Sequence, residues 1–134
     1  MDIISHALAG AATGAYYGRP LLGAAVAVLP DLVLPLRRLK HPPARYLFTH
    51  SFTFLILASI IGAIFGVGWL VFFALLSHIL LDIATHGEHW APALFAPFSN
   101  VRYRFNNEWE WFNEVWYFGA YLTLLWSAAW LLFS

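Results

Sequence analysis

Residues 51–86 read SFTFLILASIIGAIFGVGWLVFFALLSHILLDIATH, and this stretch contains no charged residue before Asp82. A run of this length exceeds the roughly 20 apolar residues that cross a bilayer once. Gly62, Gly66 and Gly68 lie near its middle, and glycines at such positions favour a turn. The stretch therefore predicts a hairpin of two apolar helices, one at 51–65 and one at 69–86.

The other apolar segments extend this pattern along the chain. Residues 3–17 and 20–34 are apolar, and Gly10 and Gly14 would allow close helix contact in lipid. Each segment is short for a full crossing, so the two could form a tilted hairpin or one could be only partly inserted. Residues 115–133 supply a last apolar crossing, about 28 Å long at helical rise. We expect an all-α integral membrane bundle of about five hydrophobic segments, namely two hairpins plus a C-terminal transmembrane helix, in a single domain over residues 1–134.

The composition favours a bilayer as the surroundings of this chain. Of its 134 residues, 61% are hydrophobic and only 10% are charged, whereas roughly a quarter are charged in a typical soluble domain. The formal net charge is zero, so nothing suggests a nucleic-acid partner. Because cysteine is absent, any metal ion would have to be held by histidine nitrogen and carboxylate oxygen. The small residues between the helices leave self-association into a homo-oligomer open.

The polar stretch at 37–50 predicts the orientation. It has no acidic residue and carries four basic ones: Arg37, Arg38, Lys40 and Arg45. By the positive-inside rule this loop should be cytoplasmic, which predicts a multi-pass protein of the cytoplasmic (inner) membrane. If both predicted hairpins form, the N-terminus, this loop and the aromatic-rich segment 87–114 share one membrane face. Within a turn or two of that cytoplasmic face fall His6, Asp31, His50, His78, Asp82 and His86.

The spacing of His78, Asp82 and His86 is the densest chemical signal in the chain. They lie at i, i+4 and i+8, on one stripe of the predicted helix. Ionisable groups within a membrane helix are costly and usually mark a functional site. His78 and Asp82 can bind one ion together, but His86 is about 12 Å along the helix from His78 and would serve a second ion, the substrate or the outer shell. The alternative is a buried His–Asp pair that ties two helices together.

Three further residues have weaker individual signals. His50 follows Thr49, which we expect to cap the third helix, and a lone histidine there would more often be interfacial than a ligand. Asp31 ends the second apolar segment, where a carboxylate conflicts with the helix dipole and so favours a cation partner. His6 near the N-terminus carries little information alone.

Taken together, these segments resemble the membrane-bound metal-dependent hydrolase family of bacteria and archaea. The matching pieces extend to about residue 105 and are short, but their order and spacing are fairly specific. They are 1–8 (MDIISHAL), 29–31 (LPD), 48–51 (FTHS), 77–82 (SHILLD), 96–100 (APFSN) and 102–103 (RY).

The resemblance implies a divalent metal site likened to that of zinc-dependent phospholipase C, with zinc as the expected metal and one or two ions. The positions that match the family's metal-binding positions are His6, Asp31, His50, His78 and Asp82. Two departures bear on a two-metal site. Val33 stands where relatives commonly have a second acid, and 45–47 (RYL) stand where they commonly have His-Arg-Gly. His86 and Glu88 are extra candidates that would compensate.

The expected function is a membrane-embedded metal-dependent hydrolase acting on a lipid-borne or amphiphilic substrate, most naturally a phosphoester. Arg45 and Arg102 would hold its anion, although their alternative role is to meet lipid headgroups. His86 or Glu88 would carry protons. Two other readings stay open: a non-enzymatic membrane protein with a structural or sensing metal site, and a scaffold without metal whose His–Asp pairs join helices.

Overall fold

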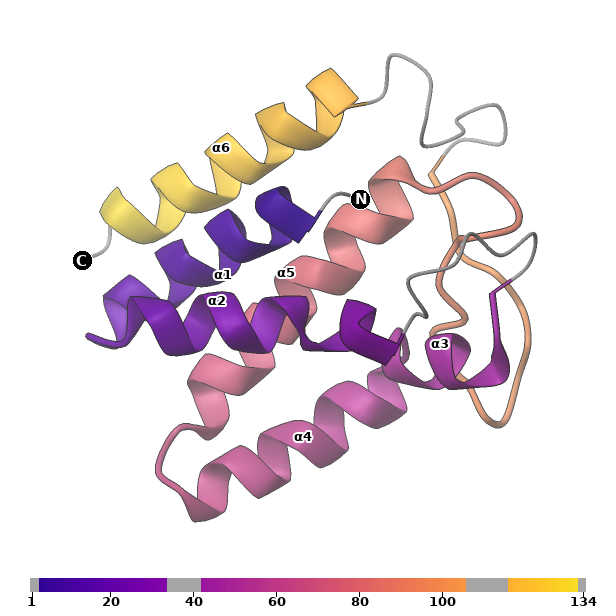
Figure 1. Ribbon diagram of the computed structural model, residues 1–134, viewed down its shortest axis with the longest axis horizontal. Coiled ribbons are helices and arrows are strands. Elements are labelled where there is room, and N and C mark those ends of the chain that lie inside the picture. The colour runs from indigo at the N-terminus through magenta and orange to yellow at the C-terminus, as the bar shows by residue number, and fades with distance from the viewer. Residues whose placement is uncertain (1–2, 34–41, 106–115, 133–134) are drawn as a thin grey trace.

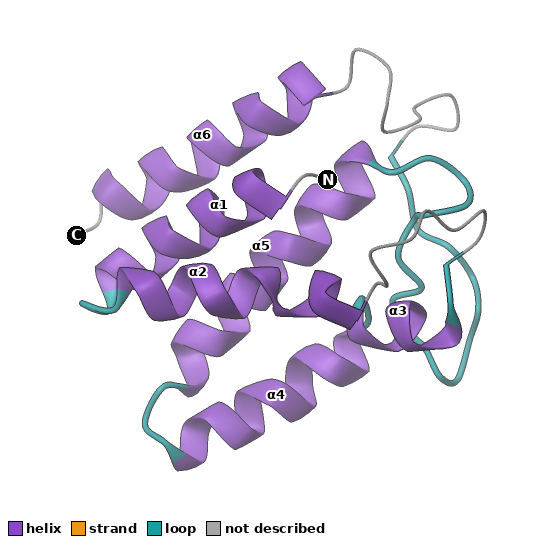
Figure 2. Cartoon of the chain, in the orientation of Figure 1, coloured by secondary structure: helices purple, strands orange, loops and turns teal. Residues whose placement is uncertain are grey.

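The computed structural model describes residues 3–33, 42–105 and 116–132, which form helices and connecting loops without a strand (Figure 2). The elements in chain order are α1 (Ile3–Tyr16), α2 (Pro20–Val28), the 3-10 helix η1 (Leu29–Val33), α3 (Ala44–Thr49), α4 (Phe52–Ile64), α5 (Gly68–Thr85) and α6 (Trp116–Leu132). The all-α prediction is confirmed for the described residues. The predicted segments 3–17, 51–65, 69–86 and 115–133 agree with α1, α4, α5 and α6 to within one residue, whereas the segment 20–34 divides into α2 and η1.

Helix α5 is the centre of the molecule, because it contacts α1, α2, α4 and α6 (Figure 1). Its apolar stripe is buried, with Leu70, Ala74, Leu75 and Ile79 essentially inaccessible. Helices α1 and α2 pack on each other, as do α4 and α5, so both predicted hairpins form as helical pairs.

The α1–α2 pair is unusually close. A Cβ atom at Gly10 would collide with the backbone of Gly23 and with Ala27, and one at Gly23 would collide with the backbone of Gly10 and Gly14. The expected close approach at Gly10 and Gly14 is therefore present. It brings α2 against α1, and α2 also packs on α5, while the η1 turn that continues α2 contacts α3.

By length and composition, α5 is the one helix among the described residues that could cross a bilayer unaided. The apolar stretches Pro20–Leu32, Phe52–Ile64 and Ala120–Leu132 are shorter. Length alone is weak support, because the buried core helix of a soluble protein has the same properties.

Two expectations about the polar segments need correction. The stretch 37–50 is more than a loop, since α3 occupies Ala44–Thr49 after Pro43, whose extended backbone precedes the first turn. Thr49 ends this helix and does not cap the next one. The cap of α4 is Ser51, whose hydroxyl accepts a hydrogen bond from the Phe54 N–H at 3.2 Å. The connection between η1 and α3 at 34–41, and 106–115 within the aromatic-rich segment, lie outside the described residues.

The loop after α5 folds back over the α3 end of the bundle. The Phe52 N–H donates to the Leu94 carbonyl at 2.9 Å, and the Phe105 N–H donates to the Ile83 carbonyl at 2.9 Å. Ala91, Ala93 and Leu94 of this loop are buried. In Figure 1 both hairpin turns lie at the left end of the molecule, whereas α3 and this loop lie at the right end.

Candidate metal centre

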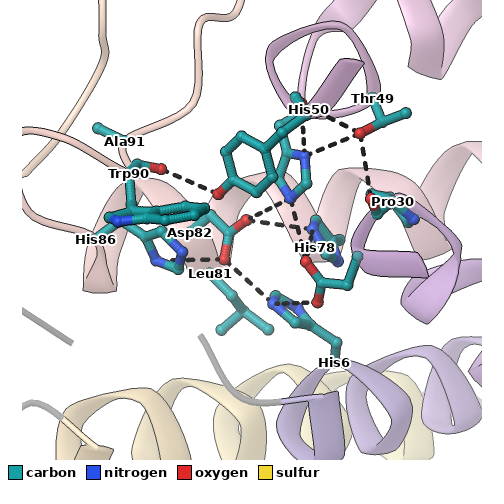
Figure 3. Close-up of polar contacts among 12 residues, drawn as sticks. His6, Pro30, Thr49, His50, His78, Leu81, Asp82, His86, Trp90 and Ala91 are labelled. Carbon is teal, nitrogen blue, oxygen red and sulfur yellow. Dashed lines mark hydrogen bonds and ion pairs between the residues drawn. The ribbon is translucent and has the colours of Figure 1, made fainter. Parts of the chain in front are cut away.

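Five side chains from four different segments meet where η1, the end of α3 and the second half of α5 come together (Figure 3). This histidine–aspartate cluster consists of His6 from α1, Asp31 from η1, His50 after α3, and His78 and Asp82 from α5. The three imidazoles are fully buried, as is Asp82. The structure thus brings together every residue that the sequence resemblance assigned to metal binding.

Asp82 lies at the middle of the cluster. Its Oδ1 atom is 3.2 Å from His6 Nε2, and its Oδ2 atom is 3.2 Å from His78 Nε2 and 3.4 Å from His50 Nε2. His78 and Asp82 are one helical turn apart on α5, which explains why the sequence spacing predicted this pair. The other two histidines reach Asp82 only through tertiary packing.

Asp31 on η1 faces the same three histidines as Asp82 on α5. Its Oδ1 atom is 3.4 Å from His50 Nε2 and 4.0 Å from His78 Nε2, while Oδ2 is 4.0 Å from His6 Nε2. Its side chain is 12% exposed, so solvent reaches the cluster at Asp31.

Backbone carbonyls orient two of the histidine rings. His78 Nδ1 is 2.7 Å from the Ala27 carbonyl oxygen, and His50 Nδ1 is 2.9 Å from the Tyr46 carbonyl oxygen. If each Nδ1 carries the proton and donates to that carbonyl, each Nε2 is left with a lone pair that faces the cluster. Fixing the tautomer in this way is typical of metal-binding histidines.

The Nε2 atoms themselves lack hydrogen bonds. Among the described residues, no hydrogen bond is made by Nε2 of His6, His50 or His78, although all three atoms are buried. Buried polar atoms are nearly always satisfied, so this set of three needs an explanation. Burial lowers the pKa of His50, although Asp31 and Asp82 oppose that shift, and a neutral imidazole is the form that binds metal.

The spacing of the donor atoms fits coordination better than direct pairing. A direct N–H···O hydrogen bond is typically about 2.9 Å long, whereas four of the nitrogen–oxygen distances here are 3.2 to 3.4 Å. Two donors that are each about 2.1 Å from a tetrahedral ion lie about 3.4 Å apart. Donor atoms of His50, His78 and Asp82 also lie within 4.8 Å of one another, as do those of His6, Asp31 and His78. The residues present therefore fit a divalent ion with nitrogen and oxygen ligands.

His86 lies beside the cluster, at the C-cap of α5. Its Nδ1 atom is 3.5 Å from Asp82 Oδ1, and its side chain is 10% exposed. Burial lowers the pKa of His86 to about 3, despite the opposing charge of Asp82, so the ring is neutral near pH 7. As helix geometry predicted, His78 and His86 do not face the same atom, because they contact different oxygens of Asp82.

The other predicted functional residues lie farther out. Glu88 is 69% exposed, and its carboxylate is 3.9 Å from Arg104 Nη1, which is not a member of the cluster. Arg45 is exposed on α3. Arg102 is partly buried, and its Nη1 atom donates to the carbonyls of His89 at 3.0 Å and Ala91 at 3.1 Å, which ties down the loop after α5.

Two supporting residues escaped the sequence analysis. The Tyr46 ring stacks on His50 with centroids 3.7 Å apart, and its hydroxyl donates to the Trp90 carbonyl at 3.0 Å. Thr49 Oγ1 donates to the Pro30 carbonyl at 3.2 Å and lies 3.1 Å from His50 Nδ1, so it joins α3 to the turn that carries Asp31. A buried tyrosine four residues before a histidine is too common in sequences to signal such a role.

Comparison with known proteins adds the family but no experimental precedent for the site. Neither the curated proteins nor the solved structures contain a match to this chain. The family model described as YdjM inner membrane protein matches residues 1–134, which is the full length. The chain therefore belongs to the YdjM inner membrane protein family.

Proposed function

We propose that this chain is a multi-pass, metal-dependent hydrolase of the inner membrane, with its site at the cytoplasmic face and a lipid-borne or amphiphilic phosphoester as substrate. One observation carries the proposal. Three buried histidines direct Nε2 atoms that make no hydrogen bond toward two carboxylates. Neutral imidazole and carboxylate together suit zinc and similar divalent ions.

A divalent ion bound here would polarise the ester oxygen and lower the pKa of a water molecule. The chain's own residues would hold that ion and limit access to it. Because Asp31 and His86 are the partly exposed members of the site, substrate would approach along their side. His86 is the better placed of the two proton-carrying candidates, since Glu88 points to the surface.

The membrane part of the proposal is supported by the surface as well as by the family. Large apolar side chains are exposed on the outer faces of several helices, for example Ile4, Leu21, Ile64 and Leu132. Soluble monomers rarely expose large apolar patches, whereas lipid would cover side chains of this kind. Helices α1, α2, α4 and α6 would then span or enter the bilayer around α5.

A structural or sensing metal site is the second candidate, and the burial of the cluster favours it. Catalytic zinc sites keep one position open to substrate, whereas His6, His50, His78 and Asp82 are all fully buried. In that case metal binding would hold α1, η1, α3 and α5 together without turnover.

The test is metal analysis of the purified full-length protein in detergent. Wild type should contain a divalent metal, and Asp82→Ala and His78→Ala should lose most of it. His89→Ala removes an exposed histidine of the adjacent loop and should leave metal content unchanged. Metal-free wild-type protein that cannot be loaded with zinc would contradict the proposal.

A panel of phosphoester substrates in mixed micelles separates the two candidates. Hydrolysis that a chelator abolishes and zinc restores is the result expected for an enzyme. Bound metal without chelator-sensitive turnover of any substrate would favour the structural site.

A further inference from the structure

The two oxygens of Asp82 face different histidines. Oδ2 contacts His50 and His78 at 3.4 and 3.2 Å, whereas Oδ1 contacts His6 at 3.2 Å and His86 Nδ1 at 3.5 Å. A carboxylate that served a single ion would not need a separate pair of histidines at each oxygen. Asp82 therefore lies between two sets of nitrogen donors.

The two oxygens of Asp31 also face different histidines. Its Oδ1 atom is 3.4 Å from His50 Nε2, on the side that His78 also faces, and its Oδ2 atom is 4.0 Å from His6 Nε2. Both carboxylates thus direct one oxygen to the His50 side and the other to the His6 side. Carboxylates that bridge two ions about 3.5 to 4 Å apart are typical of hydrolytic two-metal sites.

His78 can belong to only one of these sides. Its Nδ1 is occupied by the Ala27 carbonyl, so Nε2 is its one remaining donor. That atom is closest to Asp82 Oδ2, at 3.2 Å, and 4.0 Å from Asp31 Oδ1. The donor atom of His78 also lies within 4.8 Å of those of His6 and Asp31, but the shorter contact with Asp82 Oδ2 groups it with His50, which leaves the His6 side open to another nitrogen ligand.

We propose that the cluster is a binuclear divalent-metal centre in which Asp31 and Asp82 bridge the ions, His50 and His78 bind one ion, and His6 and His86 bind the other. This proposal rests on the proposed function, which requires only that some metal is bound. It makes His86 a ligand of the second ion in place of the proton carrier considered under the proposed function. The competing role for His86 is a hydrogen bond to Asp82 that only positions the carboxylate.

The experiment loads metal-free full-length protein in detergent with Mn²⁺ and measures the metal-to-protein ratio together with the electron paramagnetic resonance spectrum. Wild type should bind two ions per chain with the spectrum of a magnetically coupled pair. His86→Ala and His6→Ala should each bind one ion with an uncoupled spectrum, and His89→Ala should behave as wild type.

His86→Asp provides a check that does not depend on removing the side chain, because a carboxylate can replace imidazole as a ligand. It should restore the second ion and the coupled spectrum. Two coupled ions in His86→Ala would overturn the ligand role and leave His86 as a positioning residue. One ion in wild type, with chelator-sensitive hydrolysis, would overturn the binuclear centre while the proposed function stands, and no bound metal at all would remove both.

Discussion

At the scale of single residues, the histidines depend on neighbours that do not face the metal position. The Nδ1 atom of His50 lies 2.9 Å from the Tyr46 carbonyl oxygen and 3.1 Å from Thr49 Oγ1. The Tyr46 ring also stacks on the His50 ring. Burial raises the pKa of Tyr46, so its phenol stays protonated and remains a donor to Trp90. Outer-shell contacts of this kind fix ring orientation and commonly change metal affinity 10- to 100-fold.

Replacing Thr49 with valine tests this support. Thr49→Val keeps the shape of the side chain but loses the hydrogen bond to the Pro30 carbonyl and the contact with His50 Nδ1. We expect zinc affinity to fall by about 10-fold, the lower end of the range for outer-shell mutations, with the number of bound ions unchanged. Competition with a chromogenic chelator measures the affinity.

The matched control is Thr53→Val on α4, since Thr53 lines an apolar groove of about 530 Å³ that contains no member of the cluster. Equal affinities for Thr49→Val and wild type would show that Thr49 only connects helices.

At the scale of elements, close packing of α1 and α2 determines where two members of the histidine–aspartate cluster lie. His6 is on α1, and Asp31 is on the η1 turn that continues α2, so the glycine contact between these helices sets the position of both. The hydroxyl of Thr13 on α1 accepts a hydrogen bond from Trp126 Nε1 at 2.9 Å, which joins α6 to the same helix. The glycines allow the backbones of α1 and α2 to touch, as small residues commonly do at helix interfaces in lipid.

A bulkier residue at Gly23 should therefore separate the two helices and disturb the site from a distance. Gly23→Val places a branched side chain against the backbone of Gly10 and Gly14. Overpacking typically costs about 1–3 kcal/mol, and we expect a loss of unfolding free energy at the upper end of that range, with reduced metal content. Chemical unfolding in detergent, with metal analysis of the folded fraction, measures both.

Ala25→Val adds the same kind of side chain on an exposed position of α2. Its unfolding free energy should stay within about 0.5 kcal/mol of wild type. If both variants behaved alike, the α1–α2 contact would not control the site.

At the scale of the whole molecule, the cluster is confined to one end of the bundle. The apolar cavity of about 800 Å³ near the other end is lined by Tyr17 and Arg19 of one hairpin turn and by Gly66 and Val67 of the other. If the helices cross the bilayer, the two ends face opposite sides of the membrane. The basic residues of the 37–50 stretch then place the cluster on the cytoplasmic side.

The absence of cysteine makes this orientation directly testable with single-cysteine variants. Arg45→Cys and His89→Cys, at exposed positions near the cluster, should react with a membrane-impermeant maleimide only in inside-out vesicles. Arg19→Cys, in the α1–α2 turn, should react only in right-side-out vesicles. Labelling of all three from one side would mean that the first hairpin does not cross the membrane.

The sequence by itself determined most of the helices and the central pair of the histidine–aspartate cluster. Apolar runs interrupted by glycine and proline fix helix positions locally, and the one-turn spacing of His78 and Asp82 is a local property of α5. Family resemblance added His6, His50 and Asp31 to the site, and all three lie there. α3 was missed because a short helix of six residues leaves no periodic signal.

Only the tertiary structure decided how the histidines are distributed around the two carboxylates. Which oxygen of Asp82 faces which histidine depends on how α1, η1 and α3 pack around α5, and no spacing along the chain encodes those distances. The same packing left Glu88 at the surface and His86 beside Asp82, although both follow α5 within three residues of its end. Side chains distant in sequence meet only through the contacts between helices, and those contacts depend on every packed residue at once.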